Sequence, residues 1–99
     1  MKLTIIKNDG AVYKDNLSYL NLSLPTIPSD VHALQWNEST GHIEFVNNVK
    51  ANEAITELPS WANDALTAWQ TAYDAEQAEI ARIQAEAEAK KLALDAQQN

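Results

Sequence analysis

The chain has 99 residues, of which 14 are acidic and 7 are basic, so its net charge is −7. Neither half carries a Lys/Arg-rich stripe, which argues against nucleic acid and against an anionic membrane as partners, because both need concentrated positive charge. The absence of cysteine excludes disulfide bonds, thiolate metal sites and a cysteine nucleophile. No apolar run is long enough to span a bilayer, so we expect a soluble product made in the cytoplasm.

The N-terminal region predicts a β-hairpin followed by another strand. Residues 3–7 and 11–14 are mostly apolar and flank the turn 8–10, which ends in Asp-Gly, a strong signal for a tight hairpin. Residues 20–24 alternate leucine with Asn or Ser, the two-residue period of a half-buried strand. The segment 25–28 begins and ends with proline, which favours an extended linker.

A second hairpin is predicted in the middle of the chain. Residues 31–36 and 42–46 have strand-like composition, and the polar segment 37–41 ends in glycine, as a turn should. Together with the first hairpin, these segments predict a small antiparallel sheet of three to five strands. We therefore expect residues 1–58 to form a β-rich head, which makes the fold class α+β.

The remainder of the chain, residues 59–99, predicts one long helix. After Pro59 the segment contains no glycine and no further proline. It is rich in Ala, Glu and Gln, which are good helix formers. The connecting segment 52–59 allows either a strand end or a turn, and Thr56 or Ser60 is a candidate helix cap. A helix running to about residue 97 would be roughly 55 Å long, so much of it must project from the head or wrap around it.

A heptad pattern on this helix predicts a contact surface for a partner. Apolar residues recur at spacings of three, four and seven, as in the a and d positions of coiled coils. The proximal turns suit packing on the head, whereas the distal part suits a coiled coil or a docked partner. Two alternatives remain open, a solvated tail and a helix folded back entirely as core. The predicted partner or oligomer interface comprises Leu66, Trp69, Tyr73, Ile80, Ile83 and Leu94.

Catalytic and metal-binding patterns are weak in this sequence. The two glycines are isolated, so a phosphate-binding loop is absent. His32, His42 and Glu44 flank the second hairpin and are a conceivable metal set, but exposed hairpin histidines are common. Glu53 and Glu57 lie near the start of the helix, and a small head seldom encloses a catalytic pocket. We therefore predict a non-enzymatic protein with no catalytic, cofactor-binding or metal-binding residues.

Three runs of the sequence resemble a group of small bacteriophage proteins found among tail and tail-fibre genes. These runs are VHALQWN (31–37), GHIEF (41–45) and NEAITELPSWA (52–62), and the similarity extends over residues 28–75. Members of that group carry an Ala/Glu-rich C-terminal helix. The resemblance implies a virion component or an assembly helper, and it carries over no catalytic residue.

These observations lead to three hypotheses for the function. The first is a structural or adaptor subunit of a phage tail or tail fibre, forming a homo-oligomer, either trimer or dimer, or binding other tail proteins through its helix. The second is a tail-fibre assembly chaperone that is absent from the mature virion. The third is a small acidic regulator that binds a host protein, since a charge of −7 would speed association with a basic target. The expected locations are the host cytoplasm during synthesis and the virion tail for a structural subunit.

Overall fold

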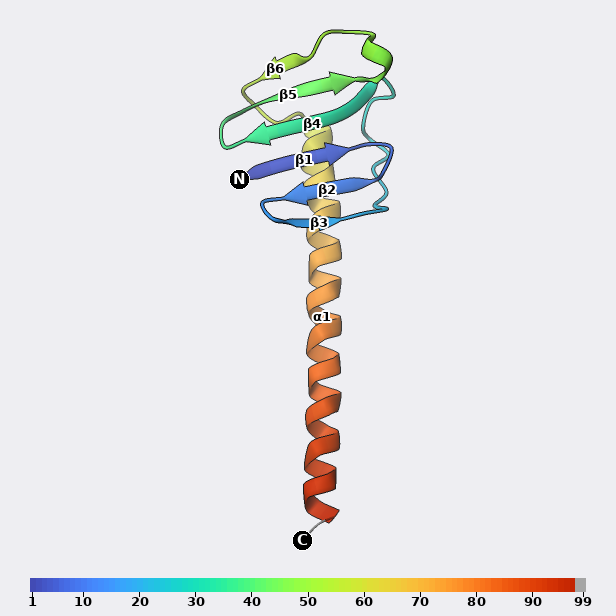
Figure 1. Ribbon diagram of the computed structural model, residues 1–99, viewed down its shortest axis with the longest axis vertical. Helices are drawn as coiled ribbons and strands as arrows, with labels where there is room; N and C mark the ends of the chain where they lie inside the picture. The colour runs from blue at the N-terminus through green and yellow to red at the C-terminus, as the bar shows by residue number, and fades with distance from the viewer. Residues whose placement is uncertain (98–99) are drawn as a thin grey trace.

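The computed structural model describes residues 1–97, with the exception of the side chain of Asn48. The chain forms a six-stranded antiparallel sheet followed by one long helix, α1 (Ser60–Gln97) (Figure 1). This arrangement confirms the predicted α+β class, with one strand more than the predicted upper limit. Residues 98–99 of the predicted helical segment lie outside the described residues. The molecule extends over 72 × 24 × 18 Å because α1 continues far beyond the sheet.

The first three strands form a meander. They are β1 (Lys2–Ile6), β2 (Ala11–Lys14) and β3 (Leu17–Tyr19). The predicted turn between β1 and β2 is present, and Gly10 has a φ of +56° in it, where a side chain would be strained. A Cβ atom at Gly10 would also lie 2.5 Å from the carbonyl oxygen of Leu22. Only glycine therefore fits this turn without rearrangement.

The strand predicted over residues 20–24 is wrong, because the chain reverses earlier than the leucine pattern indicates. Asp15 adopts a left-handed φ of 54°, which turns the chain directly from β2 into β3. Asn21 also has a positive φ, 60°, which interrupts extended backbone. The backbone N–H of Asn21 donates a hydrogen bond to the backbone carbonyl of Asp9 at 3.1 Å, so this segment is bonded to the first turn instead of to a neighbouring strand. Leu20 is consequently exposed.

The second half of the sheet is a meander of three more strands. They are β4 (Val31–Asn37), β5 (Thr40–Phe45) and β6 (Glu53–Ile55), with a short 3-10 helix, η1 (Val46–Asn48), after β5. The β4–β5 hairpin confirms the second predicted hairpin. Antiparallel pairing of β1 with β4 joins the two meanders, and the strand order is β3-β2-β1-β4-β5-β6. The sheet therefore has two short edge strands, β3 and β6.

One face of the sheet forms the hydrophobic core under α1. Alternate residues of β1, β2, β4 and β5 point to this face, and the largest fully buried side chains are Leu3, Ile5, Val12 and Leu34. Ala62 and Ala65 of α1 are also buried, at 0% and 1% exposure, and their small side chains allow the helix to lie close to the sheet. The opposite face of the sheet remains uncovered.

The helix runs behind the sheet across the strands and leaves the head beyond β3 (Figure 1). Its last large contact with the sheet is Trp69, which is 6% exposed. The indole N–H of Trp69 donates a hydrogen bond to the carbonyl of Leu17 in β3 at 3.0 Å. Beyond Tyr73, every described residue of α1 is exposed. We refer to residues 1–58 as the head, to residues 60–73 as the proximal helix and to residues 74–97 as the stem.

Candidate functional site

The stem exposes large aliphatic side chains that the head does not cover. Ile80 is 39% exposed, Ile83 52% and Leu94 58%. Isolated aliphatic residues are ordinary on protein surfaces, so a candidate contact surface is one where several of them share one face of a helix. We name the set Ile80, Ile83, Ala87 and Leu94 the seam.

The structure divides the six predicted interface residues into two groups. Leu66, Trp69 and Tyr73 belong to the hydrophobic cluster of the head or pack against it. Their contacts are therefore made within the chain, as expected for turns suited to packing on the head. Ile80, Ile83 and Leu94 lie on the stem and make no contact with the core. We carry only this second group forward as candidate partner contacts.

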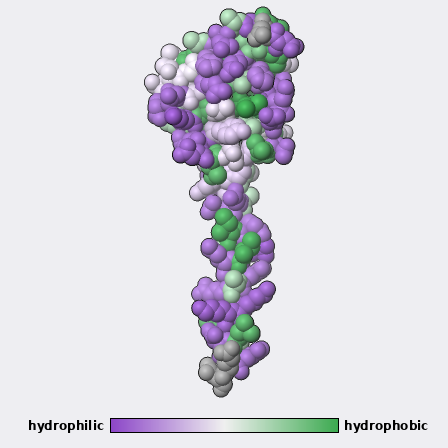
Figure 2. Space-filling view, viewed as in Figure 1, coloured by the Kyte–Doolittle hydropathy of each residue, from purple (hydrophilic) through white to green (hydrophobic). Residues whose placement is uncertain are grey.

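The seam continues the face that the proximal helix buries. Residues spaced by seven share a helix face, with a drift of about 20° per heptad. Tyr73 at the head therefore lies above Ile80, Ala87 and Leu94 on nearly the same side. Figure 2 shows apolar patches on the viewer-facing side of the stem, and Figure 1 shows the sheet covering α1 from this side. The apolar face that the sheet covers in the proximal helix thus continues into the stem, where Glu76 and Lys90 interrupt it and nothing within the described residues covers it.

An aromatic collar holds the helix where it leaves the head. Trp69 and Tyr73 stack with centroids 5.3 Å apart and planes inclined by 8°. Tyr19 of β3 meets Trp69 edge-on at 5.7 Å, and the ammonium of Lys14 lies 4.7 Å from the centre of the Trp69 ring. Aromatic pairs and cation–π contacts each add stabilisation beyond simple burial. The collar therefore fixes the direction in which the stem projects.

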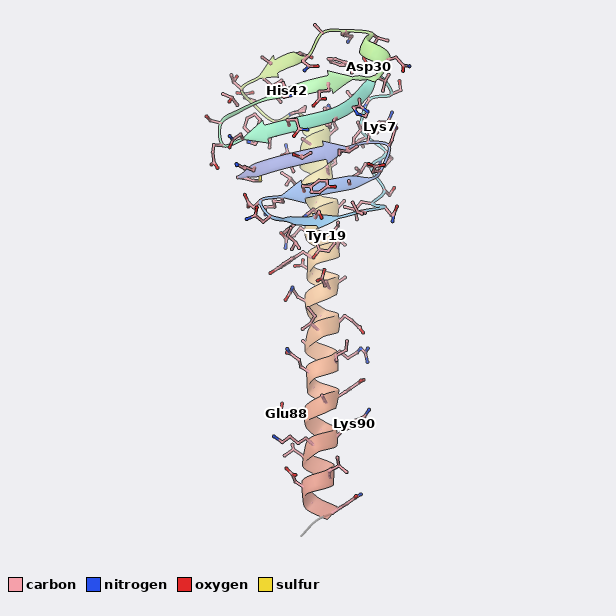
Figure 3. All side chains as sticks on the ribbon, viewed as in Figure 1. Lys7, Tyr19, Asp30, His42, Glu88 and Lys90 are labelled. Atoms are coloured by element: carbon pink, nitrogen blue, oxygen red, sulfur yellow. The ribbon has the colours of Figure 1, made fainter. Side chains whose placement is uncertain are left out.

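Tyr19 has an unusual environment within this collar. Its hydroxyl oxygen is buried and has no hydrogen-bond partner at normal distance, and the side chain lies at the edge of the sheet beside α1 (Figure 3). Burial raises the pKa of Tyr19 to about 12, and the nearby Glu76 carboxylate adds to this increase. Both effects disfavour a phenolate, because a second negative charge would lie in a poorly solvated site. Tyr19 is therefore a neutral structural group near neutral pH.

The outer side of the stem is charged and supports the helix locally. The guanidinium of Arg82 pairs with Glu79 and with Glu86, the latter at 2.7 Å. The pairing with Arg82 lowers the pKa of the Glu79 carboxyl. Glu88 and Lys90 also project from the stem (Figure 3). Exposed pairs at these spacings contribute only a few tenths of a kcal/mol each, so they favour the helix without replacing a partner for the seam.

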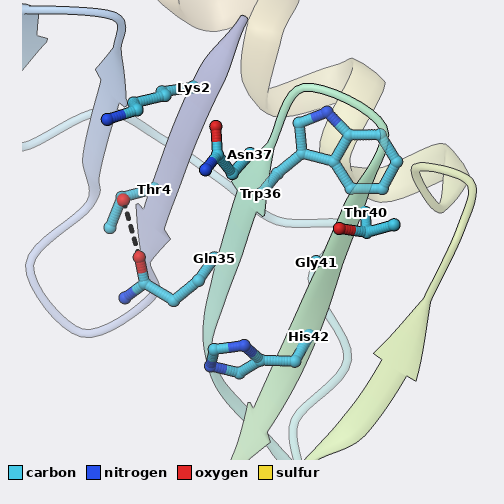
Figure 4. A pocket seen from close by; sticks show the side chains of 8 residues that line it. All are labelled: Lys2, Thr4, Gln35, Trp36, Asn37, Thr40, Gly41 and His42. Carbon is cyan, nitrogen blue, oxygen red and sulfur yellow. Dashed lines mark hydrogen bonds between the residues drawn. The ribbon is translucent and has the colours of Figure 1, made fainter.

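The uncovered face of the sheet carries a shallow hollow. Its volume is about 460 Å³, and it is lined by residues of β1, β4 and β5 (Figure 4). In it the hydroxyl of Thr4 donates a hydrogen bond to the side-chain oxygen of Gln35 at 2.7 Å. A second hollow, of about 370 Å³, adjoins it at Lys2 and Thr4 and extends to Tyr13. Both hollows are lined by more apolar than polar surface, with the polar groups at Lys2, Thr4 and Gln35 among them.

The residues considered as a metal set do not assemble. Nε2 of His42 lies 3.3 Å from a carboxylate oxygen of Glu44 on the uncovered face. Among the described residues, however, no group of three or more His, Cys, Asp or Glu side chains is placed to hold a metal ion, so His32 does not complete the pair. Within residues 1–97, α1 and the other helical segment also lack the long apolar stretch that a bilayer crossing requires.

Sequence reasoning missed the collar partner Tyr19 and the hollow on the uncovered face. The predicted strand begins at residue 20, three residues after β3 begins, and so it excludes Tyr19. The Asp15-Asn16 pair is the turn signal that indicates the earlier position. The hollow combines β1 with β4 and β5, and no local pattern reports that pairing. One signal does point to a shared face. In each of β1, β4 and β5 polar and apolar residues alternate, and the polar positions include Thr4, Gln35 and His42.

The comparisons with other proteins add no relative to this description. No protein-family model matches the chain, no curated protein matches it, and no solved structure matches it. The case for a functional surface therefore depends on the residues themselves, and the seam on the projecting stem is the strongest candidate.

Proposed function

We propose that this protein is a non-enzymatic assembly subunit that docks through the seam of its stem. The observation that carries the proposal is the apolar face of α1, which is buried by the sheet up to Tyr73 and exposes Ile80, Ile83 and Leu94 beyond it. The helix is held in place by the aromatic collar, so the seam is presented in a fixed direction. Such a layout suits a module that binds another helix.

The energetics favour a partner that covers most of the seam. Full burial of one Ile or Leu side chain stabilises a complex by about 1.5–3 kcal/mol. Association costs roughly 4–15 kcal/mol in lost freedom, so a single contact is too little. Ile80, Ile83 and Leu94 lie along most of the stem, and their full burial together contributes at most about 4.5–9 kcal/mol, so a partner must contact all three and add contacts of its own. An elongated helical partner meets this requirement.

We place this activity in a bacteriophage tail or tail fibre. The segments that resemble the phage group form β4, β5 and β6 and the start of α1. They therefore build half of the sheet and the part of α1 that anchors the stem. Coiled-coil contacts between elongated subunits are what a fibre requires, and the acidic surface agrees with a partner other than nucleic acid.

A transient chaperone is the second candidate. Its specific support is the shortness of the stem together with a seam that is polar at Glu76 and Lys90, two of its d positions. Such a seam binds more weakly than a full heptad repeat, which suits a helper that must dissociate. The structural subunit is favoured because the collar orients the stem rigidly.

The test uses a phage that encodes this chain. Peptides of the chain are quantified by mass spectrometry in purified particles and in tail-assembly intermediates. A fixed stoichiometry in particles supports the structural subunit, and presence in intermediates alone identifies the chaperone. Absence from both would sink the proposal.

A matched pair of variants connects this result to the seam. Ile80→Asp with Ile83→Asp adds two charges to the seam and should remove the chain from particles and intermediates while the head stays folded. Ala78→Asp with Ala85→Asp adds the same charge to the opposite side of the stem and should leave incorporation intact. Equal incorporation of both variants would show that another surface docks.

A further inference from the structure

We infer that the seam is covered by the stem of a second copy of this chain, running antiparallel to the first. This inference rests on the proposed docking role and names the partner of the same surface. The position of the sheet, the length of the stem and the distribution of charge along it all favour this arrangement.

The sheet decides which direction of pairing fits. The sheet covers the proximal helix on the same side of α1 that exposes the seam in the stem. A partner bound to the seam would therefore lie in the same plane as the sheet, just beyond β3 (Figure 1). A sheet lies about 10 Å from what it covers, and paired helices lie 8–10 Å apart. A helix on the seam would therefore run into β3 if it continued toward the head.

Parallel pairing of two copies meets this obstacle directly. The proximal helix of the second copy would occupy the position of the sheet of the first copy. The proximal helix of the first copy would likewise occupy the position of the sheet of the second. Both sheets would have to fit between helices that are only about 10 Å apart in the stem. A straight α1, fixed by Trp69 and Tyr73, does not allow the separation that two intervening sheets require.

Antiparallel pairing removes the obstacle because the heads lie at opposite ends. The stem comprises 24 residues, from Asp74 to Gln97, and is about 36 Å long. When Gln97 of the second copy reaches the level of Tyr73, the two stems overlap fully and stop at β3. In this register Ile83 lies level with Ala87 of the second copy, Ile80 with the aliphatic part of Lys90, and Leu94 with Glu76. The seam then ends where the sheet begins.

The charge along the stem favours the same direction. Residues 74–81 contain three acidic residues and no basic one, which gives −3, whereas residues 90–97 contain two lysines and one aspartate, which gives +1. Antiparallel pairing places each acidic third beside the lysine-bearing third of the other copy. Parallel pairing would place the acidic thirds side by side, where like charges repel. Steric fit and electrostatics therefore select one arrangement.

The test measures the distance between identical positions in the full chain. Because the sequence has no cysteine, Ala96→Cys or Gln84→Cys provides a single site for a spin label and pulsed dipolar spectroscopy. Antiparallel stems place two labels at position 96 about 35–40 Å apart, whereas parallel stems place them about 20 Å apart, from a rise of 1.5 Å per residue. Labels at position 84, near mid-stem, are close together in either arrangement and report that pairing occurs.

Sedimentation equilibrium of the unlabelled chain completes the test. The inference expects a dimer that Ile80→Asp with Ile83→Asp converts to monomer and that Ala78→Asp with Ala85→Asp leaves intact. A monomer at high concentration, or a short distance at position 96, overturns the antiparallel pair. Either result leaves the docking role itself to be decided by the particle experiment, so the two failures are distinguishable.

Discussion

Two residues of the head show how single atoms control the geometry of the stem. Tyr19 contributes the β-sheet half of the aromatic collar, and its buried hydroxyl lies near the Glu76 carboxylate. Gly41 in β5 lies under Trp36 of β4, where the sheet has no room for a side chain. Tyr19 lies beside α1 at the edge of the sheet, whereas Gly41 borders the hollow on the uncovered face.

The first prediction concerns the pH dependence of Tyr19→Phe. The pKa of Tyr19 is raised to about 12 in the folded protein from an ordinary value near 10. Its contribution to stability is therefore complete below about pH 10 and is lost as the pH rises toward 12, because only the unfolded chain gains the phenolate. Denaturant unfolding should show that the wild type loses more stability over this interval than Tyr19→Phe. Parallel curves for the two proteins would contradict the assignment.

The second prediction concerns Gly41→Ala. A Cβ atom at this position would lie 2.2 Å from the carbonyl oxygen of Gln35 and 3.0 Å from the Trp36 side chain. The backbone must shift to accept it, which costs about 1–3 kcal/mol. Chemical denaturation monitored by near-ultraviolet circular dichroism measures this loss. Thr40→Ala at the neighbouring exposed position is the control and should change stability by less than about 0.5 kcal/mol.

At the scale of elements, the division of α1 into a packed part and a bare part is the central feature. The proximal helix shares its apolar face with the sheet, and the stem presents the same face to solvent. Tertiary packing supplies most helix stability in proteins, whereas an isolated helix is marginal in water. The stem therefore depends on good helix formers and on Arg82 with its two glutamates.

A prediction at this scale separates the two contributions of Trp69. Trp69→Ala removes the ring that joins α1 to β3 and should cost about 3–5 kcal/mol, as for other large buried aromatics. Trp69→Phe keeps most of the packing and loses the hydrogen bond to Leu17, which should cost about 0.5–1.5 kcal/mol. Thermal and denaturant unfolding of both variants provide the comparison. Equally small losses would mean that the collar does not hold the helix.

How far the sequence predicts these elements depends on how local their signals are. The helix and both hairpins follow from composition, periodicity and an Asp-Gly turn, which act over a few residues. The position of β3 depends on the left-handed backbone of Asp15, and leucine alternation outweighed that weak signal. The boundary between the proximal helix and the stem depends on the width of the whole sheet, which no single segment encodes. That Ile80 and Ile83 contact a partner stays a prediction, whereas the burial of Trp69 in the head was only one of two possibilities.

At the scale of the whole molecule, the head and the stem are separable. Every described residue beyond Tyr73 is exposed, so the core does not use the stem. Removal of residues 77–99 should therefore change the free energy of unfolding by no more than about 0.5 kcal/mol and should abolish association between copies. Removal of residues 66–99 takes Trp69 and Tyr73 as well and should unfold the head. Calorimetry and sedimentation of both truncations test this division, and a large loss of stability in the shorter truncation would contradict it.

The two outermost strands limit the size of anything this protein builds. β3 and β6 have three residues each, and Glu53 places a negative charge on the β6 edge. Continued strand addition requires a long unpaired edge as its template, so the sheet provides no route for endless growth. When two copies pair through the same helix face around a two-fold axis, that face is fully occupied and cannot bind a third copy. An antiparallel pair of stems would therefore be a closed unit of two copies, and it would not extend itself by adding further copies.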